Sequence, residues 1–177
     1  MSDEENEQVR LEDYDPAWPA RFEVERQRLV EVLQLWMAGP IEHVGSTAIP
    51  GLRAKPIIDI MVAVRTLEES RPAIDILRDL SYGYFPHRAD VMHWFCKPSP
   101  EFRTHHLHLV PFRSQLWTER LLFRDYLRSH PQAVSEYATL KARLAEEHRF
   151  DRERYTDAKG PFIQRILSIA SAAADEQ

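Results

Sequence analysis

The sequence predicts an α/β (α+β) domain in which a small mixed sheet flanked by helices is followed by a C-terminal helical segment. Short apolar runs of strand length alternate with amphipathic helical stretches up to about residue 112, and only helical periodicity follows. A chain of 177 residues is also long enough to bury one proper core. We therefore expect one domain over residues 9–172, with the sheet at about 40–112 and a helical cap at about 114–172.

Periodicity and turn signals place the individual elements. Apolar runs bounded by Gly, Pro, Asn or Asp indicate strands, and spacings of three and four residues indicate helices. The expected elements are an edge strand at 9–14, a helix at 15–39 ended by Gly39, strands at 41–45 and 57–64, a helix at 67–80 closed by Gly83, a hairpin of strands at 91–97 and 104–111, a helix capped by Ser114, a helix opened by Pro131, and a last helix at 152–172 that Gly160-Pro161 must kink or divide.

Composition and charge limit the class of protein. The net charge of −5 argues against general nucleic-acid binding, which usually needs a basic excess. The single cysteine, Cys96, excludes an internal disulfide and fits a reducing compartment. Residues 1–8 are acidic without an apolar anchor, which indicates a disordered tail rather than a signal peptide. No apolar run approaches the ~20 residues of a membrane span, so we expect a cytoplasmic protein without membrane contact.

Asp59 is the residue that most needs a partner. It interrupts the apolar run 57–64, which is typical of a strand covered on both faces. An ionised carboxylate in such a strand costs several kcal/mol unless a cation, a metal or dense hydrogen bonding meets it. Gly45-Ser46 ends the preceding strand, where Ser46 and the nearby backbone N–H groups would cradle a phosphate. The alternative is an ordinary turn in which Ser46 caps a helix.

Histidines are the first candidate partners for Asp59. His106 and His108 alternate with leucines, so both face one side of their strand, and His43 directly precedes the Gly45-Ser46 turn. One carboxylate with two or three imidazoles suits Zn²⁺, Mn²⁺, Fe²⁺ or Ni²⁺ better than Mg²⁺. A buried Asp-His hydrogen-bond network without metal is the other interpretation, and both are open at this point.

Cationic side chains are the second group of candidates. Arg53 and Lys55 lie between the two strands, where they would bind the oxygens of an anionic ligand, or Lys55 would neutralise Asp59 instead. Lys159 lies one helical turn from Tyr155 and would line a cleft between cap and sheet, or snorkel along the surface. For Arg124-Asp125 we expect a structural ion pair that ties the cap to the sheet.

Four segments together resemble one family. E-H-V-G-S-T-A-I-P-G-L-R-A-K-P-I-I-D-I, H-L-H-L-V, L-L-F-R-D-Y-L-R and Y-T-D-A-K-G-P-F-I occur in an order that resembles the GrpB-like proteins, over roughly residues 9–170. The resemblance implies the nucleotidyltransferase superfamily and its fold, with Gly45-Ser46 near a nucleotide phosphate. It also implies a link to dephospho-CoA kinase, to which such domains are fused in some bacteria.

The chain departs from the acidic pattern of active nucleotidyltransferases. In those enzymes an acid-x-acid pair and a third acid hold two Mg²⁺ ions over the triphosphate. Asp59 matches the first acid, but Met61 replaces the second and His106 and His108 stand where the third is expected. The resemblance therefore implies a nucleoside triphosphate and a divalent metal (Mn, Zn or Mg), whereas the missing acids argue against a standard pair of Mg²⁺ ions.

Three functions follow as hypotheses. The first is metal-dependent transfer of a nucleotidyl or phosphoryl group, with Ser46 as phosphate ligand and Asp59 as metal ligand. The second is a non-catalytic module that binds a nucleotide, another small anionic ligand or a partner, or assists folding. The third is a metal-dependent hydrolase that uses Asp59 with His106 and His108. The missing acids favour the second hypothesis over the first on mechanistic grounds.

Overall fold

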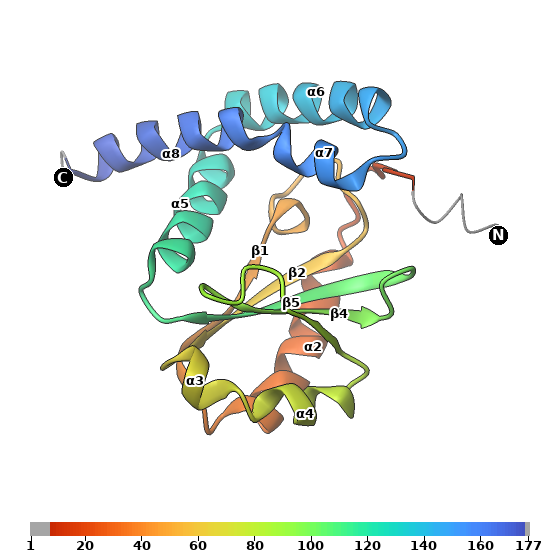
Figure 1. The fold of residues 1–177 in the computed structure, drawn as a ribbon. Coiled ribbons are helices and arrows are strands. Elements are labelled where there is room, and N and C mark those ends of the chain that lie inside the picture. Colours follow the sequence, from red (N-terminus) through yellow and green to blue (C-terminus); the bar gives the residue numbers. More distant parts are fainter. Residues whose placement is uncertain (1–7, 176–177) are drawn as a thin grey trace.

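A computed structural model of the chain describes residues 8–175 and shows three layers (Figure 1). A five-stranded sheet of order β1-β2-β5-β4-β3 forms the middle layer, and helices cover both of its faces. The strands are β1 (Met37–Val44), β2 (Ile58–Val64), β3 (Gly83–Phe85), β4 (His93–Pro98) and β5 (Arg103–Pro111). The helices are α2 (Trp18–Leu33), α3 (Leu67–Ser70), α4 (Ala73–Arg78), α5 (Gln115–Ser129), α6 (Pro131–Glu147), α7 (Arg152–Asp157) and α8 (Gly160–Asp175), with one 3₁₀ turn, η1 (Ser46–Ala48).

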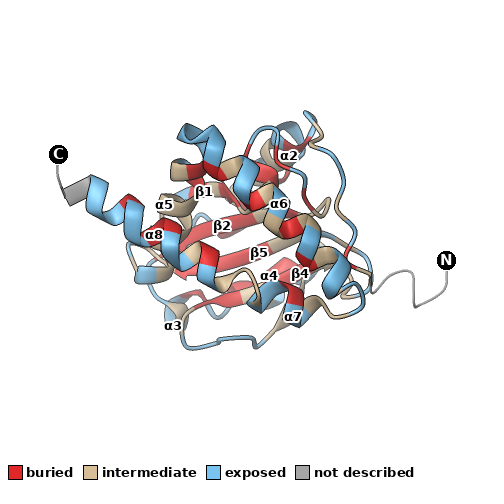
Figure 2. Cartoon of the chain, turned by 90° about the horizontal axis from the view of Figure 1, so that it is seen from above, coloured by how far each residue is buried: buried red, intermediate tan, exposed pale blue. Residues whose placement is uncertain are grey.

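The predicted fold class is confirmed. The sheet is mixed, because β2 runs parallel to β5 and antiparallel to β1, while β4 and β5 form the predicted antiparallel hairpin. β2 and β5 are the central strands, and Figure 2 shows them buried beneath α6. The predicted tail at 1–8 lies outside the described residues except for its last position.

The two faces of the sheet bury different cores. Against one face, α2 contributes Trp18, Leu29 and Leu33, which are fully buried with the side chains of β2 and β5 that face that way. Burial of a large side chain of this kind contributes about 1.5–3 kcal/mol, so this core supplies much of the stability of the domain. The opposite face carries a smaller apolar cluster around Met61 and Trp117 of α5. Asp59, His106 and His108 share that second face with Met61.

The helices of the cap begin at the predicted signals, and the last of them runs to Asp175. The Ser114 hydroxyl accepts a hydrogen bond from the Trp117 backbone N–H and so caps α5, and Pro131 opens α6. The last helix is divided between α7 and α8 at the predicted Gly160-Pro161 position. In Figure 1, α6, α7 and α8 lie above the sheet, and α5 connects them to it. The cap therefore closes over the face that carries Asp59.

Gly39 has a different role from the predicted one. The first helix ends at Leu33, and Gly39 lies within β1 rather than at a helix end. A Cβ at Gly39 would lie 2.9 Å from the Phe112 ring and 3.1 Å from the Ala63 Cβ. The glycine therefore permits close approach of a side chain that is distant in the sequence, a contact that local helix-stop signals do not reveal.

Three other element predictions were also wrong in detail. The helix expected at 67–80 is interrupted at Pro72 and forms the short helices α3 and α4, because a proline cannot donate the hydrogen bond that continues a helix. Gly83 begins β3 rather than closing a helix. The edge strand expected at 9–14 is reduced to a single bridge between Glu12 and Ala54.

Arg124 connects the cap to the sheet, as predicted. Its guanidinium donates to Glu42 Oε2 at 2.6 Å and to the His43 carbonyl at 3.0 Å, and it also pairs with Asp125. Arg124 is 8% exposed, so its guanidinium is largely shielded from water, whereas the Asp125 side chain is more than half exposed.

Substitution of Arg124 should therefore destabilise the domain strongly. Arg124→Ala leaves Glu42 without its cation, and removing one partner of a shielded pair costs about 3 kcal/mol or more. Arg128→Ala is the matched control on the same helix, because the half-exposed Arg128 guanidinium donates one hydrogen bond, to the Ala48 carbonyl at 2.9 Å. We expect a loss of about 1 kcal/mol for the control. Urea unfolding measures both values, and equal losses would contradict the structural role of Arg124.

Among the described helices, none has the length and apolar character needed to cross a membrane.

Candidate functional site

The turn between β1 and η1 is built around Gly45. Its φ is 71°, a left-handed conformation that favours glycine. A Cβ at this position would overlap Asp59 Oδ2 and would lie 3.0 Å from both the Cβ and the Cγ of Asp59. The Gly45-Ser46 turn and the Asp59 carboxylate, predicted separately from the sequence, are therefore in direct contact.

Asp59 accepts a hydrogen bond from one of the two predicted histidines and lies close to the other. β2 and β5 place Asp59 beside His106 and Met61 beside His108. His106 Nδ1–H donates to Asp59 Oδ1 at 2.9 Å, and His108 Nε2 lies 3.8 Å from the same oxygen. Burial acts to raise the pKa of Asp59, but interactions with both histidines hold that pKa well below its usual value. Asp59 is therefore an anion at neutral pH.

Burial keeps His108 neutral and leaves two ring nitrogens without partners. Burial lowers the pKa of His108 to about 3, against the opposing effect of Asp59. The Nε2 atoms of His106 and His108 are buried, and neither has a hydrogen-bond partner among the described residues. His108 Nδ1 lies 3.5 Å from the Met92 sulfur, a weak acceptor. His108 therefore supplies little positive charge of its own to Asp59.

His43 lies on the other face of the sheet. β1 pairs Val44 with Asp59 and His43 with Ile60, so His43 points toward α2. Its ring stacks on Phe22 at 4.8 Å, and its Nε2 lies 2.9 Å from the Thr47 hydroxyl. Over residues 8–175, no group of three or more His, Cys, Asp or Glu side chains is placed to share a metal ion. The structure thus brings His106 and His108 to Asp59 and does not bring His43.

Three of the four lysines of the chain gather near Asp59 and Ser46. Lys55 and Lys159 both lie against the ring of Tyr155, with Nζ to centroid distances of 5.4 Å and 4.4 Å. Lys141 Nζ donates to the Ser46 hydroxyl at 3.1 Å and to the backbone carbonyl of Arg53. The cluster therefore joins the turn after β1, the segment before β2, α6 and the α7–α8 junction. We call Lys55, Lys141 and Lys159 the lysine cluster.

Positive charge in the lysine cluster is not balanced. In the described part of the chain, none of the three ammonium groups has a carboxylate within ion-pairing distance. Burial, together with repulsion from Lys159 and Lys55, lowers the pKa of Lys141 to about 7. Burial, with repulsion from Lys55, lowers the pKa of Lys159 to about 8. Burial also lowers the pKa of Lys55, while Asp59 acts to raise it.

The sequence prediction missed Lys141. It lies on the buried stripe of α6 between Tyr137 and Leu144, where an apolar residue is expected, and it is 1% exposed. A lysine inside a helical apolar stripe was the available signal, but such lysines commonly extend to the surface. Arg120 of α5 was also missed, and its guanidinium interacts electrostatically with Asp59 from the same side of the sheet.

Arg53 turns away from the lysine cluster. Its guanidinium pairs with Asp13 at 2.9 Å and donates to the Leu11 carbonyl at 3.4 Å, and more than half of the side chain is exposed. Its backbone carbonyl, rather than its predicted cationic side chain, takes part in the site by accepting from Lys141. Arg53 therefore ties the N-terminal segment to the loop before β2.

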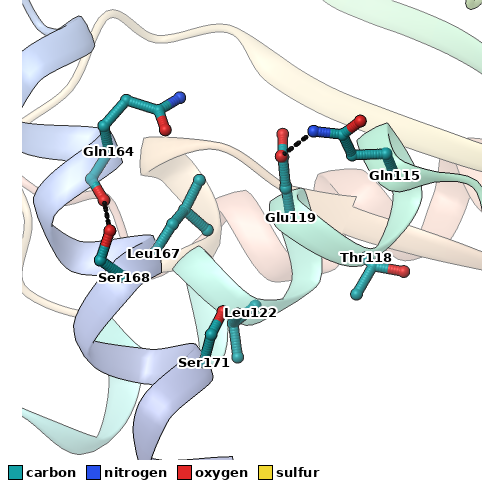
Figure 3. A pocket seen from close by; sticks show the side chains of 8 residues that line it. All are labelled: Gln115, Thr118, Glu119, Leu122, Gln164, Leu167, Ser168 and Ser171. Carbon is teal, nitrogen blue, oxygen red and sulfur yellow. Dashed lines mark hydrogen bonds between the residues drawn. The ribbon is translucent and has the colours of Figure 1, made fainter.

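Two surface hollows lie away from Asp59, Ser46 and the lysine cluster. One is shallow and lies between α5 and α8, where Glu119 accepts a hydrogen bond from Gln115 and Ser168 donates to the Gln164 carbonyl (Figure 3). The other lies between the N-terminal segment and α6. Neither is lined by Asp59, Ser46 or a member of the lysine cluster.

Comparisons with known proteins agree with the four-segment resemblance. A family model described as GrpB protein matches residues 8–168. The chain is 39% identical over 176 residues to a UPF0157 protein of Pseudomonas aeruginosa, covering 97% of this chain and 72% of that protein. The fold matches the crystal structure of conserved protein GrpB from Enterococcus faecalis with a TM-score of 0.83 and 35% sequence identity, covering 91% and 96% of the two chains.

A more distant similarity extends to a larger enzyme. The chain is 29% identical over 195 aligned residues to a protein named dephospho-CoA kinase from Mycolicibacterium paratuberculosis. The alignment covers 94% of this chain and spans about half (47%) of that protein. Sequence, fold and the extent of the family match together show that the chain belongs to the GrpB family.

Proposed function

We propose that the protein binds a phosphate-bearing small molecule, a nucleotide, between the sheet and the helical cap. The observation that carries the proposal is the lysine cluster, in which Lys141 contacts Ser46, Lys55 and Lys159 lie against Tyr155, and no member pairs with a carboxylate among residues 8–175. Shielding like charges from water without a counter-ion is costly, and an anionic ligand would offset that cost. Phosphate oxygens accept charge-assisted hydrogen bonds from lysine, which binds phosphate as a point charge.

A nucleotidyltransferase-like role is supported by the position of Asp59. The Gly45-Ser46 turn lies against this carboxylate, so a phosphate held at Ser46 would lie near it. Asp59 Oδ1 is engaged by the histidines, which leaves Oδ2 as the oxygen best placed to ligate a metal brought in with the nucleotide. Met61 is fully buried at the position of the second acid and supplies no ligand. Of Asp59 and Met61, only Asp59 can ligate a metal. Binding of an anion is therefore better supported than metal-dependent transfer.

A binding screen tests the proposal. Thermal shift with ATP, GTP, CTP, UTP and coenzyme A precursors, each with and without Mg²⁺, Mn²⁺ or Zn²⁺, should show stabilisation of the wild type by at least one phosphate-bearing ligand. Pyrophosphate release in the same mixtures separates transfer from binding alone. Arg143→Met is the matched control for substitutions in the lysine cluster, because Arg143 is an exposed cation on α6, the helix that carries Lys141. Absence of stabilisation by any of these ligands at low salt would contradict the proposal.

Asp59→Asn separates metal-dependent from metal-independent binding. Without metal, Asp59 repels a phosphate, so Asn should strengthen nucleotide binding about tenfold, as expected when one like charge is removed from a shielded site. If the nucleotide binds through a metal held by Asp59, the same substitution should weaken binding and remove its dependence on Mg²⁺ or Mn²⁺. Titration calorimetry with and without EDTA distinguishes these two results. An unchanged affinity in both conditions would place the ligand away from Asp59.

Binding should weaken as the pH rises. The pKa of Lys141 is lowered to about 7 and that of Lys159 to about 8, so both lose their charge between pH 6.5 and 9 in the free protein. A bound phosphate favours the ammonium form of Lys159, so affinity falls as the pH rises through about 8. Ionisation of the phosphate itself would change affinity in the opposite direction. Lys159→Arg, which stays charged, should flatten the profile, and an affinity that increases with pH in the wild type would contradict the account.

A further inference from the structure

Ser46 and Lys141 have the geometry of a nucleophile and its general base. Lys141 Nζ lies 3.1 Å from Ser46 Oγ, within the range expected for such a pair. Lys141 is in turn oriented by a third group, the Arg53 carbonyl. A neutral amine has two N–H bonds and one lone pair, so donation of one N–H to that carbonyl leaves the lone pair available to the Ser46 hydroxyl. Nucleophile, base and orienting group are therefore all present.

The surroundings of Lys141 favour the neutral amine. Its side chain is 1% exposed, it has no ion-pair partner among residues 8–175, and its neighbours Lys55 and Lys159 are cations. The pKa of Lys141, lowered to about 7, agrees with this geometry. Ser46, by contrast, is partly exposed, and it begins η1 immediately after the left-handed Gly45. The nucleophile is thus accessible while its base is shielded.

We propose that Ser46 is a catalytic nucleophile, deprotonated by Lys141, that attacks the phosphorus of a bound phosphate ester or anhydride. This rests on the proposed function, because the lysine cluster must hold the anionic substrate. The Ser46 hydroxyl proton passes to Lys141 Nζ as Oγ forms a bond to phosphorus. The bond from phosphorus to the leaving oxygen breaks, and the leaving group departs with the electron pair. Lys141 ends as an ammonium, and Lys55 and Lys159 stabilise the charge on the other phosphate oxygens.

The competing interpretation is structural. A charged Lys141 would donate to both Ser46 and Arg53 and simply tie the loop before β2 to α6. An ammonium group has no lone pair to accept the Ser46 proton, so Lys141 would not activate Ser46. Covalent reactivity and its dependence on pH therefore separate the two interpretations, whereas stability does not.

The test uses bis(4-nitrophenyl) phosphate, a monoanion whose nitrophenolate leaving group needs no acid. The wild type should release one nitrophenolate and gain one nitrophenyl phosphate on Ser46, detected by intact-protein and peptide mass spectrometry. Ser46→Ala should gain none. Lys141→Met should react about 100-fold more slowly at pH 8, since a positioned general base contributes roughly that factor or more. The wild-type labelling rate should rise from pH 6 and level off above about pH 8.

Several results would overturn the proposal. They are an unlabelled wild type that still binds nucleotide, an adduct that persists in Ser46→Ala, or an unchanged rate in Lys141→Met. If Lys141→Met does not fold, the wild-type profile decides, and a rate that is flat between pH 6 and 9 overturns the role of Lys141. Nucleotide binding is measured separately by calorimetry. Binding without labelling therefore leaves the proposed function standing, and absence of both overturns the two together.

Discussion

Gly45→Ala is expected to destabilise the protein by about 3 kcal/mol or more. A non-glycine residue at a φ of 71° costs roughly 1–2 kcal/mol. The added Cβ would also overlap Asp59 Oδ2 and crowd two further Asp59 atoms, so the carboxylate must move away from His106. Displacing Asp59 removes a shielded charge-assisted hydrogen bond worth about 1.5–3 kcal/mol. Both costs arise at one position, because the turn and the carboxylate are packed together.

Gly51→Ala separates the two costs. Gly51 has a φ of 77°, close to that of Gly45, but a Cβ there would meet nothing within 4 Å. Gly51→Ala should therefore lose only about 1–2 kcal/mol of stability, the cost of the backbone strain. Chemical unfolding of both variants measures the difference. Equal losses would show that Asp59 does not lie against Gly45 in solution, and would remove the contact on which the site depends.

Lys55→Met and Lys159→Met should each weaken nucleotide binding while stabilising the free protein. Met keeps the apolar stem of lysine and removes the charge. Loss of one charge-assisted hydrogen bond, about 1.5–3 kcal/mol, corresponds to a Kd roughly ten- to a hundredfold higher. Stability should increase, because both lysines are shielded and repel each other and Lys141. Nucleotide affinity and the stability of the free protein then change in opposite directions, as is common at functional sites that lower the stability of the fold.

The destabilising effect of a buried lysine should also appear in the pH dependence of stability. A lysine whose pKa is lowered in the folded state binds fewer protons than in the unfolded state between its two pKa values. For Lys159, folded near 8 and unfolded near 10.5, the free energy of unfolding should therefore rise with pH over that interval. Lys159→Met should reduce this rise. Urea unfolding from pH 7 to 10 measures it, and a variant that is less stable than the wild type throughout would contradict the account.

Local patterns predicted much of the fold. The apolar run at 57–64 identified the central strand β2, the Ser114 cap identified α5, and Gly160-Pro161 marked the division between α7 and α8. Alternation also placed His106 and His108 on one face, where the structure brings them to Asp59. Each of these depends on neighbours in the sequence or on a period of two, which the sequence displays directly.

Contacts between distant segments were not predictable in this way. The role of Gly39 depends on Phe112, and the face on which His43 lies depends on the register of β1 against β2. Lys141 is brought to Ser46 by the packing of α6 over the sheet, 95 residues away in the sequence. A lysine on an apolar stripe gives no indication of its partner until that packing is known.

The most direct test of the anion site is calorimetric titration of the wild type with ATP and with pyrophosphate at pH 8, in two buffers of different ionisation enthalpy. We expect binding at one site with proton uptake, because Lys159, whose pKa is lowered to about 8, gains charge when the phosphate enters. We also expect that uptake falls in Lys159→Met and remains in Arg143→Met. Binding without proton uptake, or binding that is unchanged in Lys55→Met and Lys159→Met, would contradict the central claim that the lysine cluster holds the phosphate.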